Sequence, residues 1–352
     1  MIRPVLHIGA LTPYALADPG GKDTVSLAQN ESAFPASPAA LVAGRESLAD
    51  LPLYPDPDWT DLREAIAEVH GVDPQRILCG AGSMELIGCL MRAYAGAGDV
   101  VLGTEFSYAY VASASAQVQA DFVRAQEMDF TVSVDEILAS VCDRTRIVFV
   151  CNPGNPSGTG IANSEIVRLR NSLPDDILLA VDQAYGEFAD DDPDALFPLV
   201  ERGTTVVLRT FSKAYSLAGA RVGWGLFPGP IAGELRKVLN PNNVSVFAQA
   251  AAAAAMRDQA HMKMVVSETA RIRDRFCSDL KAMGLRVPRS QTNFVLIRFA
   301  STKAAEQAHA KLVDNGLLLR PMTAFGLSDC LRATICPEPV MARVLKVLEE
   351  TL

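Results

Sequence analysis

The chain has 352 residues, of which 49% are hydrophobic and 21% are charged. This length suffices for about two domains with sizeable cores, and the composition is ordinary for a soluble enzyme and excludes a disordered chain. The formal net charge of -9 argues against nucleic acid or an anionic membrane as a partner, since either would call for clustered Lys and Arg. An anionic ligand would therefore need a few arginines placed close to it.

Seven short apolar runs predict the strands of one sheet. They cover residues 76–79, 99–103, 120–123, 146–151, 177–182, 205–210 and 221–227. Amphipathic segments such as SMELIGCLMRAYA and SVDEILASVC lie between several of these runs and predict helices. Because the runs are continuously apolar and do not alternate with polar residues, we expect a mostly parallel seven-stranded sheet with helices on both faces, the α/β plan.

A long helical segment follows the last of these runs. Residues 248–284 are rich in Ala, Met and Arg and predict a nearly uninterrupted helix that ends at Gly284. Beyond it, NFVLIRFA, a helix near 303–315, GLLLR, CLRATI and a final helix predict a smaller α+β domain. We expect an N-terminal arm (1–40) that contributes to the small domain and the substrate site, a large domain (41–245) and a small C-terminal domain (246–352).

The cysteines and histidines indicate the redox state of the thiols and whether a metal site is expected. The seven cysteines include no C-x-x-C pair and lie mostly in apolar runs, so we expect reduced thiols and a cytoplasmic location. The first residues, MIRPVLHIGALTPY, lack the pattern of a secretory signal, and no apolar run approaches transmembrane length. The four histidines do not stand at metal-ligand spacing, so we expect no metal site.

Lys213 is the most informative residue. It lies in TFSKAYSLAGARVGW, among small and hydroxylated residues, with Arg221 eight positions later. This is what a pyridoxal phosphate site needs: the amine makes a Schiff base, Ser212 and Arg221 hydrogen-bond a phosphate, and small residues let the backbone approach the cofactor. Taken alone, the lysine fits an exposed loop residue better than a cofactor site, because most lysines are exposed.

Other polar residues follow the predicted strands, where ligands of open α/β sheets bind. After 76–79 comes GAGSMELIG, in which Ser83 is a good helix N-cap and the first turn suits a phosphate; the alternative is a tight corner. After 99–103 comes Tyr108, which either stacks on a flat ring or packs in the core.

Two later strand ends offer an amide and a carboxylate. Asn155, in NPGNPSGTG, points to a ring oxygen or belongs to a surface turn. Asp182 ends a fully apolar run, where it needs a cation. A pyridinium nitrogen supplies one and makes the ring an electron sink, although a strand cap or an arginine partner is the alternative. Tyr185 is placed to hydrogen-bond the ring's phenolic oxygen.

An ordered set of motifs carries a resemblance over essentially the whole chain. The set is LTPYAL around Tyr14, LAQNES around Asn30, LYPDP around Tyr54, GAGSME, FSYAY, NPGNPSG, DQAY, SKAYSLAGARVGW, QTNFVLIRF and CLRAT. With these motifs the chain resembles the fold-type I pyridoxal-phosphate-dependent aminotransferases, and within them the histidinol-phosphate aminotransferase family.

The resemblance implies a role for each matching residue. Lys213 would form the Schiff base and then move the proton from the substrate Cα, Asp182 would pair with the pyridine nitrogen, and Tyr185 with Asn155 would bond the ring oxygen. The remaining cofactor contacts would be Tyr108, stacked on the ring, a phosphate cup of Ser83, Met84, Ser212 and Arg221, and Thr210. Tyr54 would reach the cofactor phosphate of the neighbouring subunit, which implies a homodimer with shared sites.

Substrate recognition requires several cations. Histidinol phosphate carries a phosphate arm where an amino acid carries its α-carboxylate, so one pocket must accept a dianion and then the carboxylates of glutamate. The resemblance implies that the substrate-binding residues are Tyr14, Asn30, Arg320, Arg332 and Arg343. Arg343 also fits an ordinary exposed helix position.

The sequence departs from the family's commonest pattern at Met84, Gln183 and Asn242. The expected activity is a ping-pong transamination between histidinol phosphate and 2-oxoglutarate, in histidine biosynthesis, through a Lys213 Schiff base. Asn242 lies near the place where the family binds the phosphate arm, so it leaves the amino donor open. Three alternatives remain on the same scaffold: an aromatic aminotransferase, an aminotransferase for other amino acids, and a phosphothreonine-type decarboxylase. A non-catalytic regulatory module is a further alternative, against which the intact Lys213, Asp182 and Arg221 speak.

Overall fold

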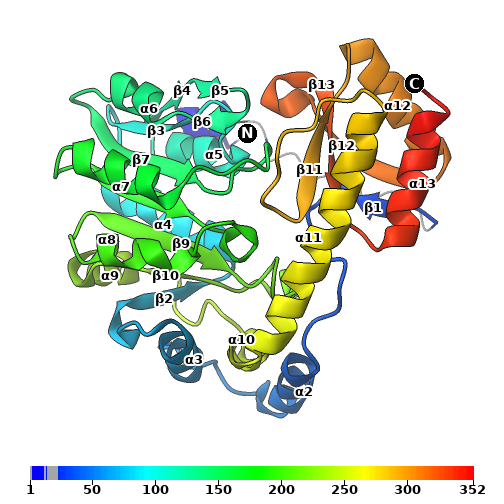
Figure 1. The fold of residues 1–352 in the computed structure, drawn as a ribbon. Coiled ribbons are helices and arrows are strands. Elements are labelled where there is room, and N and C mark those ends of the chain that lie inside the picture. The colour runs from blue at the N-terminus through cyan, green and yellow to red at the C-terminus, as the bar shows by residue number, and fades with distance from the viewer. Residues whose placement is uncertain (1, 12, 14–22) are drawn as a thin grey trace.

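The structure, a computed structural model, describes residues 2–11, 13 and 23–352. Two larger sheets organise these residues, one of seven strands and one of four. Figure 1 shows the large sheet and its helices as one lobe and the small sheet, with α11, α12 and α13, as a second lobe beside it. The predicted site residue Tyr14 lies outside the described residues.

The large sheet is mostly parallel, as predicted. Its strands, in spatial order, are β2 (Ile77–Gly80), β10 (Gly223–Leu226), β9 (Thr205–Thr210), β8 (Leu178–Asp182), β7 (Thr145–Cys151), β3 (Val100–Thr104) and β4 (Asp121–Ala125). β10 runs antiparallel to both of its neighbours, and the other pairs are parallel. The central strands are buried along their length because helices cover both faces, which is why their sequences are continuously apolar.

Helices connect the parallel strands. They are α4 (Ser83–Tyr94), α5 (Ala109–Gln117), α6 (Val134–Ser140), α7 (Asn163–Ser172) and α8 (Phe197–Val200), and α9 (Gly229–Arg236) follows the antiparallel strand β10. Figure 1 shows α7 and α8 in front of the sheet and α4 behind it. A short hairpin, β5 (Glu127–Met128) with β6 (Thr131–Val132), follows β4.

The small sheet joins segments from both ends of the chain. Its strands, in spatial order, are β1 (Val25–Leu27), β12 (Leu317–Met322), β13 (Leu327–Thr334) and β11 (Phe294–Arg298), and its helices are α12 (Thr302–Asp314) and α13 (Glu338–Glu349). β1 pairs with β12 in parallel, so the N-terminal arm is part of this sheet.

The long helix predicted over 248–284 is interrupted. The structure has α10 (Val246–Arg257) and α11 (Gln259–Ala282), separated by Asp258, whose carboxylate accepts a hydrogen bond from the backbone N–H of His261 and so caps α11. Helix propensity alone did not reveal this cap. Gly284, with φ +82°, follows the end of α11.

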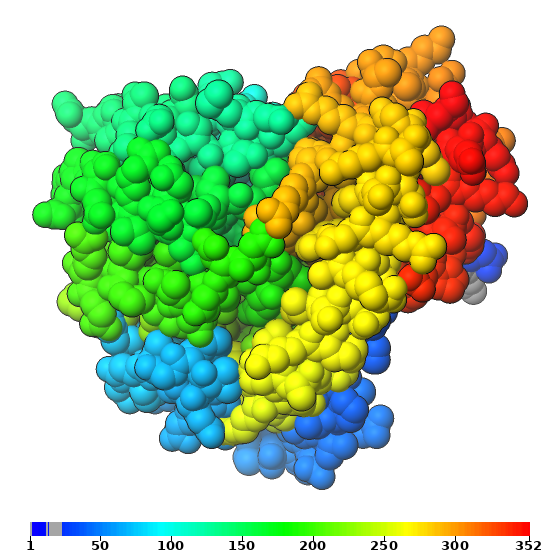
Figure 2. Space-filling model, viewed as in Figure 1, coloured from blue at the N-terminus to red at the C-terminus, as the bar shows by residue number. Residues whose placement is uncertain are grey.

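The buried cores separate at the same place. Alanines of α10 belong to the core of the large sheet, together with α2 (Pro38–Glu46) and α3 (Thr60–His70), whereas Ile272 and Phe276 of α11 belong to the core of the small sheet. The predicted domain boundary at residue 245 therefore lies one helix too early. On the face shown in Figure 2, the green residues of the large lobe meet the yellow and orange residues of α11 and the small lobe along a seam. In the part of the chain that the structure describes, no helix is long and apolar enough to cross a membrane.

Candidate active site

A cavity of about 460 Å³ lies at the carboxyl ends of β3, β7, β8 and β9, closed on its other side by β12 and β13. It brings together thirteen of the sixteen predicted site residues: Asn30, Ser83, Met84, Tyr108, Asn155, Asp182, Tyr185, Thr210, Ser212, Lys213, Arg221, Arg320 and Arg332. They come from segments far apart in the sequence. Most lie at one edge of the large sheet, where its strands end, whereas Asn30, Arg320 and Arg332 come from the side of the small sheet.

Lys213 presents its amine to this cavity. Nζ donates hydrogen bonds to the carbonyl oxygens of Asn30 (2.7 Å) and Gln29 (3.4 Å). Burial, reinforced by the nearby positive charge of Arg332, lowers the pKa of this amine to about 7. A substantial fraction of the amine is therefore neutral near neutral pH, as a nucleophile or a general base requires.

Asp182 is the last residue of β8 and is 3% exposed. Its Oδ1 accepts a hydrogen bond from the backbone N–H of Ala184 at 3.0 Å, which is its only partner among the described residues. Burial raises the pKa of this carboxyl to about 7. A buried carboxylate with so little compensation is suited to a ligand that brings a cation.

Tyr185 and Asn30 form a buried pair beside Lys213. Asn30 donates from Nδ2 to the Tyr185 hydroxyl at 3.0 Å, and Asn293 donates to the carbonyl oxygen of Asn30 at 3.1 Å. Burial raises the pKa of Tyr185, so its hydroxyl stays protonated and remains a donor. Asn30, predicted to bind substrate, thus contacts Lys213 and Tyr185.

Two arginines approach from the small sheet. Arg332 is 4% exposed and donates from Nη1 to Asn155 Oδ1 at 2.6 Å and from Nη2 to the carbonyl oxygen of Ala28 at 2.9 Å. Arg320 stands opposite Arg332 in the register of β12 and β13, and both line the cavity. Their adjacent positive charges favour an anionic ligand on this side.

The start of α4 forms the opposite wall. Its N-cap is Gly82, with φ +79°, and not Ser83 as predicted, so Ser83 and Met84 are the first helical residues. Their backbone N–H groups have no intrahelical acceptor and attract an anion. A Cβ on Gly82 would lie 2.6 Å from Nη2 of Arg221, so a larger residue would displace this guanidinium, and the φ of +79° itself favours glycine. Thr210 donates to Ser212 at 3.0 Å within the same wall.

Two of the predicted site residues that the structure describes, Arg343 and Tyr54, do not line the cavity. Arg343 donates to the carbonyl oxygen of Asn315 at 3.0 Å on the exposed face of α13, whose Met341, Val344 and Leu348 are buried. The prediction that Arg343 binds substrate is therefore wrong, because the amphipathic phase of α13 turns it outward. Tyr54 is 88% exposed, and its role toward a neighbouring subunit stays a prediction. Tyr14 lies outside the described residues.

Sequence reasoning missed several lining residues, among them Gln29, Glu31, Cys151 and Phe325. Cys151 ends β7 in register with Asp182, so the rule that pointed to Asp182 would also have found it. Glu31 and Gln29 lie inside the LAQNES motif. Phe325 follows β12 in a short turn and carried no signal. No cluster able to hold a metal ion occurs among the described residues.

A buried lysine and aspartate at the carboxyl edge of a mostly parallel sheet, faced by arginines from a smaller one, define a transferase of fold type I. The chain belongs to the family described as aminotransferase class I and II, whose model matches residues 22–348. The predicted family is thereby confirmed.

Relatives and solved structures agree with this membership. A histidinol-phosphate aminotransferase of Dinoroseobacter shibae is 43% identical over 317 residues, 90% of this chain and 88% of the relative. One of Jannaschia sp. is 39% identical over 350 residues, 99% of this chain and 97% of the relative. The crystal structure of the histidinol-phosphate aminotransferase from Sinorhizobium meliloti, in complex with pyridoxal-5'-phosphate, is 29% identical, has a TM-score of 0.92 and covers 100% of this chain and 98% of that one.

Proposed function

We propose that this protein is a pyridoxal-phosphate-dependent aminotransferase that moves an amino group from histidinol phosphate to 2-oxoglutarate, in histidine biosynthesis. The observation that carries the proposal is one cavity in which the Lys213 amine and the Asp182 carboxyl face two arginines of the small sheet. The names of the relatives support the same substrate.

The residues of the cavity fit the cofactor. Asp182 has an unmet need for a cation, which the ring nitrogen meets, and the first turn of α4 with Arg221 offers donors for the phosphate. Tyr185 holds a protonated hydroxyl for the ring oxygen. A Cβ on Gly223 would lie 2.3 Å from the backbone nitrogen of Ser83, so β10 and α4 meet closely enough to shape this cup.

Each residue then has a task in the reaction. When bound, pyridoxal phosphate supplies an electron sink that makes the substrate Cα proton removable. Asp182, which is 3% exposed at the end of β8, would hold the ring nitrogen and keep it protonated. Lys213 would hold the cofactor covalently, and its amine, once released, would take the proton from the substrate Cα. Burial lowers the pKa of this amine to about 7 in the cofactor-free protein, which favours the neutral form that a base requires.

The arginines select the substrate. Arg332, fixed by its bonds to Asn155 and Ala28, presents a buried guanidinium to the anionic end nearest the reacting carbon. Arg320 lies beside it and is only half-buried, so it has room to accept the larger phosphate arm. With glutamate in the second half-reaction, the same two side chains bind carboxylates.

The site is shared between two copies of the chain in a homodimer. Large apolar side chains are exposed together in the segment that carries Tyr54; they are Leu41, Val42, Leu48, Leu51, Leu53 and Tyr54 itself. Such a set on one segment is expected at a subunit contact. Burial of this segment against a second copy brings Tyr54 toward the neighbouring cofactor. A cytoplasmic location stays a prediction.

A donor panel tests the proposal. Purified protein with pyridoxal phosphate and 2-oxoglutarate is offered histidinol phosphate, histidinol, phenylalanine or phosphothreonine, and glutamate formation is followed. We expect turnover with histidinol phosphate, and Arg320→Ala should weaken it far more than any turnover of unphosphorylated donors. Activity with phenylalanine but never with histidinol phosphate would refute the substrate, and release of CO₂ from phosphothreonine would indicate a decarboxylase. Borohydride reduction should fix the cofactor on Lys213, and label on another lysine would refute the site.

A further inference from the structure

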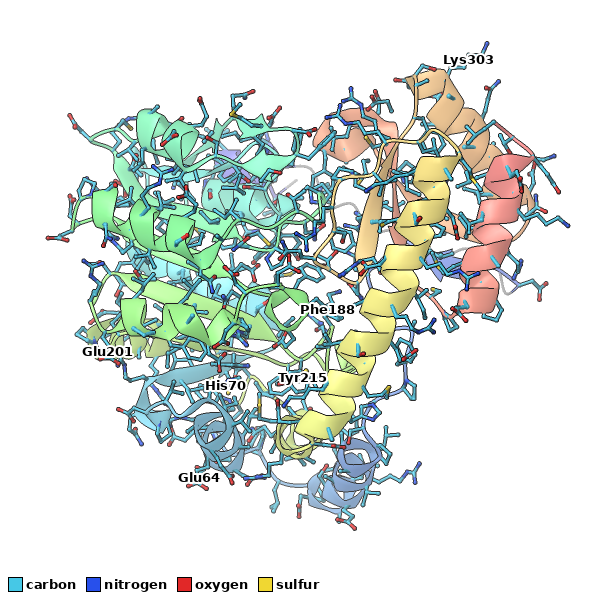
Figure 3. The ribbon with its side chains drawn as sticks, in the orientation of Figure 1. Glu64, His70, Phe188, Glu201, Tyr215 and Lys303 are labelled. Atoms are coloured by element: carbon cyan, nitrogen blue, oxygen red, sulfur yellow. The ribbon has the colours of Figure 1, made fainter. Side chains whose placement is uncertain are left out.

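A second buried polar cluster lies behind the cavity, centred on Arg209 in β9. The Arg209 side chain is 1% exposed and lies over the rings of Phe197 (5.3 Å) and Trp224 (5.8 Å). Asp194 accepts from its Nη2 at 2.7 Å and also contacts Nδ1 of His70 at 2.7 Å. Figure 3 labels His70 at the end of α3, on the lower side of the large sheet.

The cluster grips the segment that carries Asp182 and Tyr185. Arg209 Nε donates to Gln183 Oε1 at 3.2 Å, and its Nη1 forms an ion pair with Glu187 Oε1 at 3.5 Å. Gln183 follows Asp182 directly, and Glu187 lies two residues after Tyr185. One guanidinium therefore holds both sides of the turn whose other residues, Asp182 and Tyr185, line the cavity.

The contacts of Arg209 explain why this chain has a glutamine at position 183, where it departs from the commonest pattern of the family. Its Oε1 accepts from Arg209 while its Nε2 donates to the carbonyl oxygen of Pro193 at 3.1 Å. A glutamate would lack this donor and would add a third carboxylate beside a guanidinium that already faces Glu187 and Asp194. The amide is thus fitted to this cluster.

We propose that Arg209 is a positioning residue, which never touches the cofactor but fixes the Asp182 carboxyl and the Tyr185 hydroxyl by clamping Gln183 and Glu187 from behind. The inference rests on the proposed function, because it assigns these two groups to the cofactor ring. Arg209 makes these contacts with three different nitrogens of its planar guanidinium. A lysine amine cannot donate in the same three directions.

Arg209→Lys tests the clamp, with Arg170→Lys as a matched control. Arg170 is also buried in the large core, at 4% exposure, but it donates to the carbonyl oxygens of Leu173, Pro174 and Ile177, at the opposite edge of the sheet from the cavity. Both variants keep the positive charge but replace the planar guanidinium with an amine. Three quantities are measured for each protein: the unfolding midpoint without cofactor, the dissociation constant of pyridoxal phosphate, and the circular dichroism of its bound absorption band.

We expect both variants to lose stability, but only Arg209→Lys to weaken cofactor binding, by about tenfold or more, and to alter the dichroism. Gln183→Ala, a milder change, should shift binding and dichroism in the same direction and serves if Arg209→Lys does not fold. Unchanged binding and dichroism in the Arg209 and Gln183 variants would overturn the inference, as would an equal loss of binding in Arg170→Lys. Wild-type protein that binds no pyridoxal phosphate would overturn the proposed function and this inference together, whereas the other failures leave the proposed function intact.

Discussion

Gly223→Ala probes the closest backbone approach in the cofactor cup. A Cβ at this position in β10 would lie 2.3 Å from the backbone nitrogen of Ser83, 2.8 Å from the carbonyl carbon of Gly82 and 3.0 Å from the carbonyl oxygen of Arg209. All three are backbone atoms, so no side-chain rotation relieves the clash. The first turn of α4 must retreat by about 1 Å to reach an ordinary contact.

This retreat should cost both stability and affinity. Forcing one methyl group into a packed contact destabilises a protein by about 1–3 kcal/mol. The same movement withdraws the N–H groups of Ser83 and Met84 from the phosphate, and each hydrogen bond to a charged group contributes about 1.5–3 kcal/mol. With about 1.4 kcal/mol per tenfold change, partial loss of both bonds weakens pyridoxal phosphate binding by about 100-fold.

Urea unfolding of the cofactor-free protein and equilibrium dialysis with pyridoxal phosphate separate the two effects. Gly233→Ala in α9 is the matched control, because a Cβ there meets nothing within 4 Å. In that helix alanine should raise stability by about 0.5–1 kcal/mol and leave the affinity unchanged. If Gly223→Ala bound the cofactor as tightly as wild type, the assignment of the phosphate to the start of α4 would be wrong.

The remaining predictions concern charge, the subunit contact and the corrected arginine. Asp182→Asn should stabilise the cofactor-free protein above about pH 7, by on the order of 4 kcal/mol. The carboxyl has a pKa of about 7 in the folded protein and 3.8 in the unfolded chain, so the stability of the wild type falls as the pH rises from about 4 to 7. The stability difference between wild type and variant should therefore vanish below this range. Urea unfolding at several pH values measures the difference, and a difference that does not change with pH would contradict the prediction. Tyr54→Phe should weaken cofactor binding about tenfold in dialysis without changing the unfolding midpoint of the cofactor-free protein, and unchanged binding would remove Tyr54 from the site. Arg343→Ala should leave kcat/KM for histidinol phosphate within about twofold and stability within about 0.5 kcal/mol, and a large rise in KM would restore the discarded assignment.

The sequence predicted those parts of the molecule that obey local periodicity. Most strands of the large sheet were recognised because burial on both faces makes each a continuous apolar run, although the edge strand β4 is only partly buried. Lys213, Asp182 and Asn155 were found because they stand near strand ends. The break at Asp258 was missed, since it depends on one capping side chain within a run of good helix formers. Arg343 was misassigned, although the apolar Met341 and Val344 mark the buried face of α13 and place Arg343 on the exposed face. The Arg209 cluster joins residues that no spacing rule relates.

The two titrating groups of the cavity explain why such a site is unfavourable without its ligand. Burial lowers the pKa of Lys213 and raises that of Asp182, both to about 7, so each group is pushed toward its neutral form. These shifts are costs of folding, because water stabilises both charges in the unfolded chain. In the proposed site, Lys213 and Asp182 would hold pyridoxal phosphate through its aldehyde carbon and its ring nitrogen, and both costs would be offset together. The chain therefore keeps a lysine and an aspartate in positions that stability alone would fill with apolar residues, and it holds the second of them from behind through Arg209.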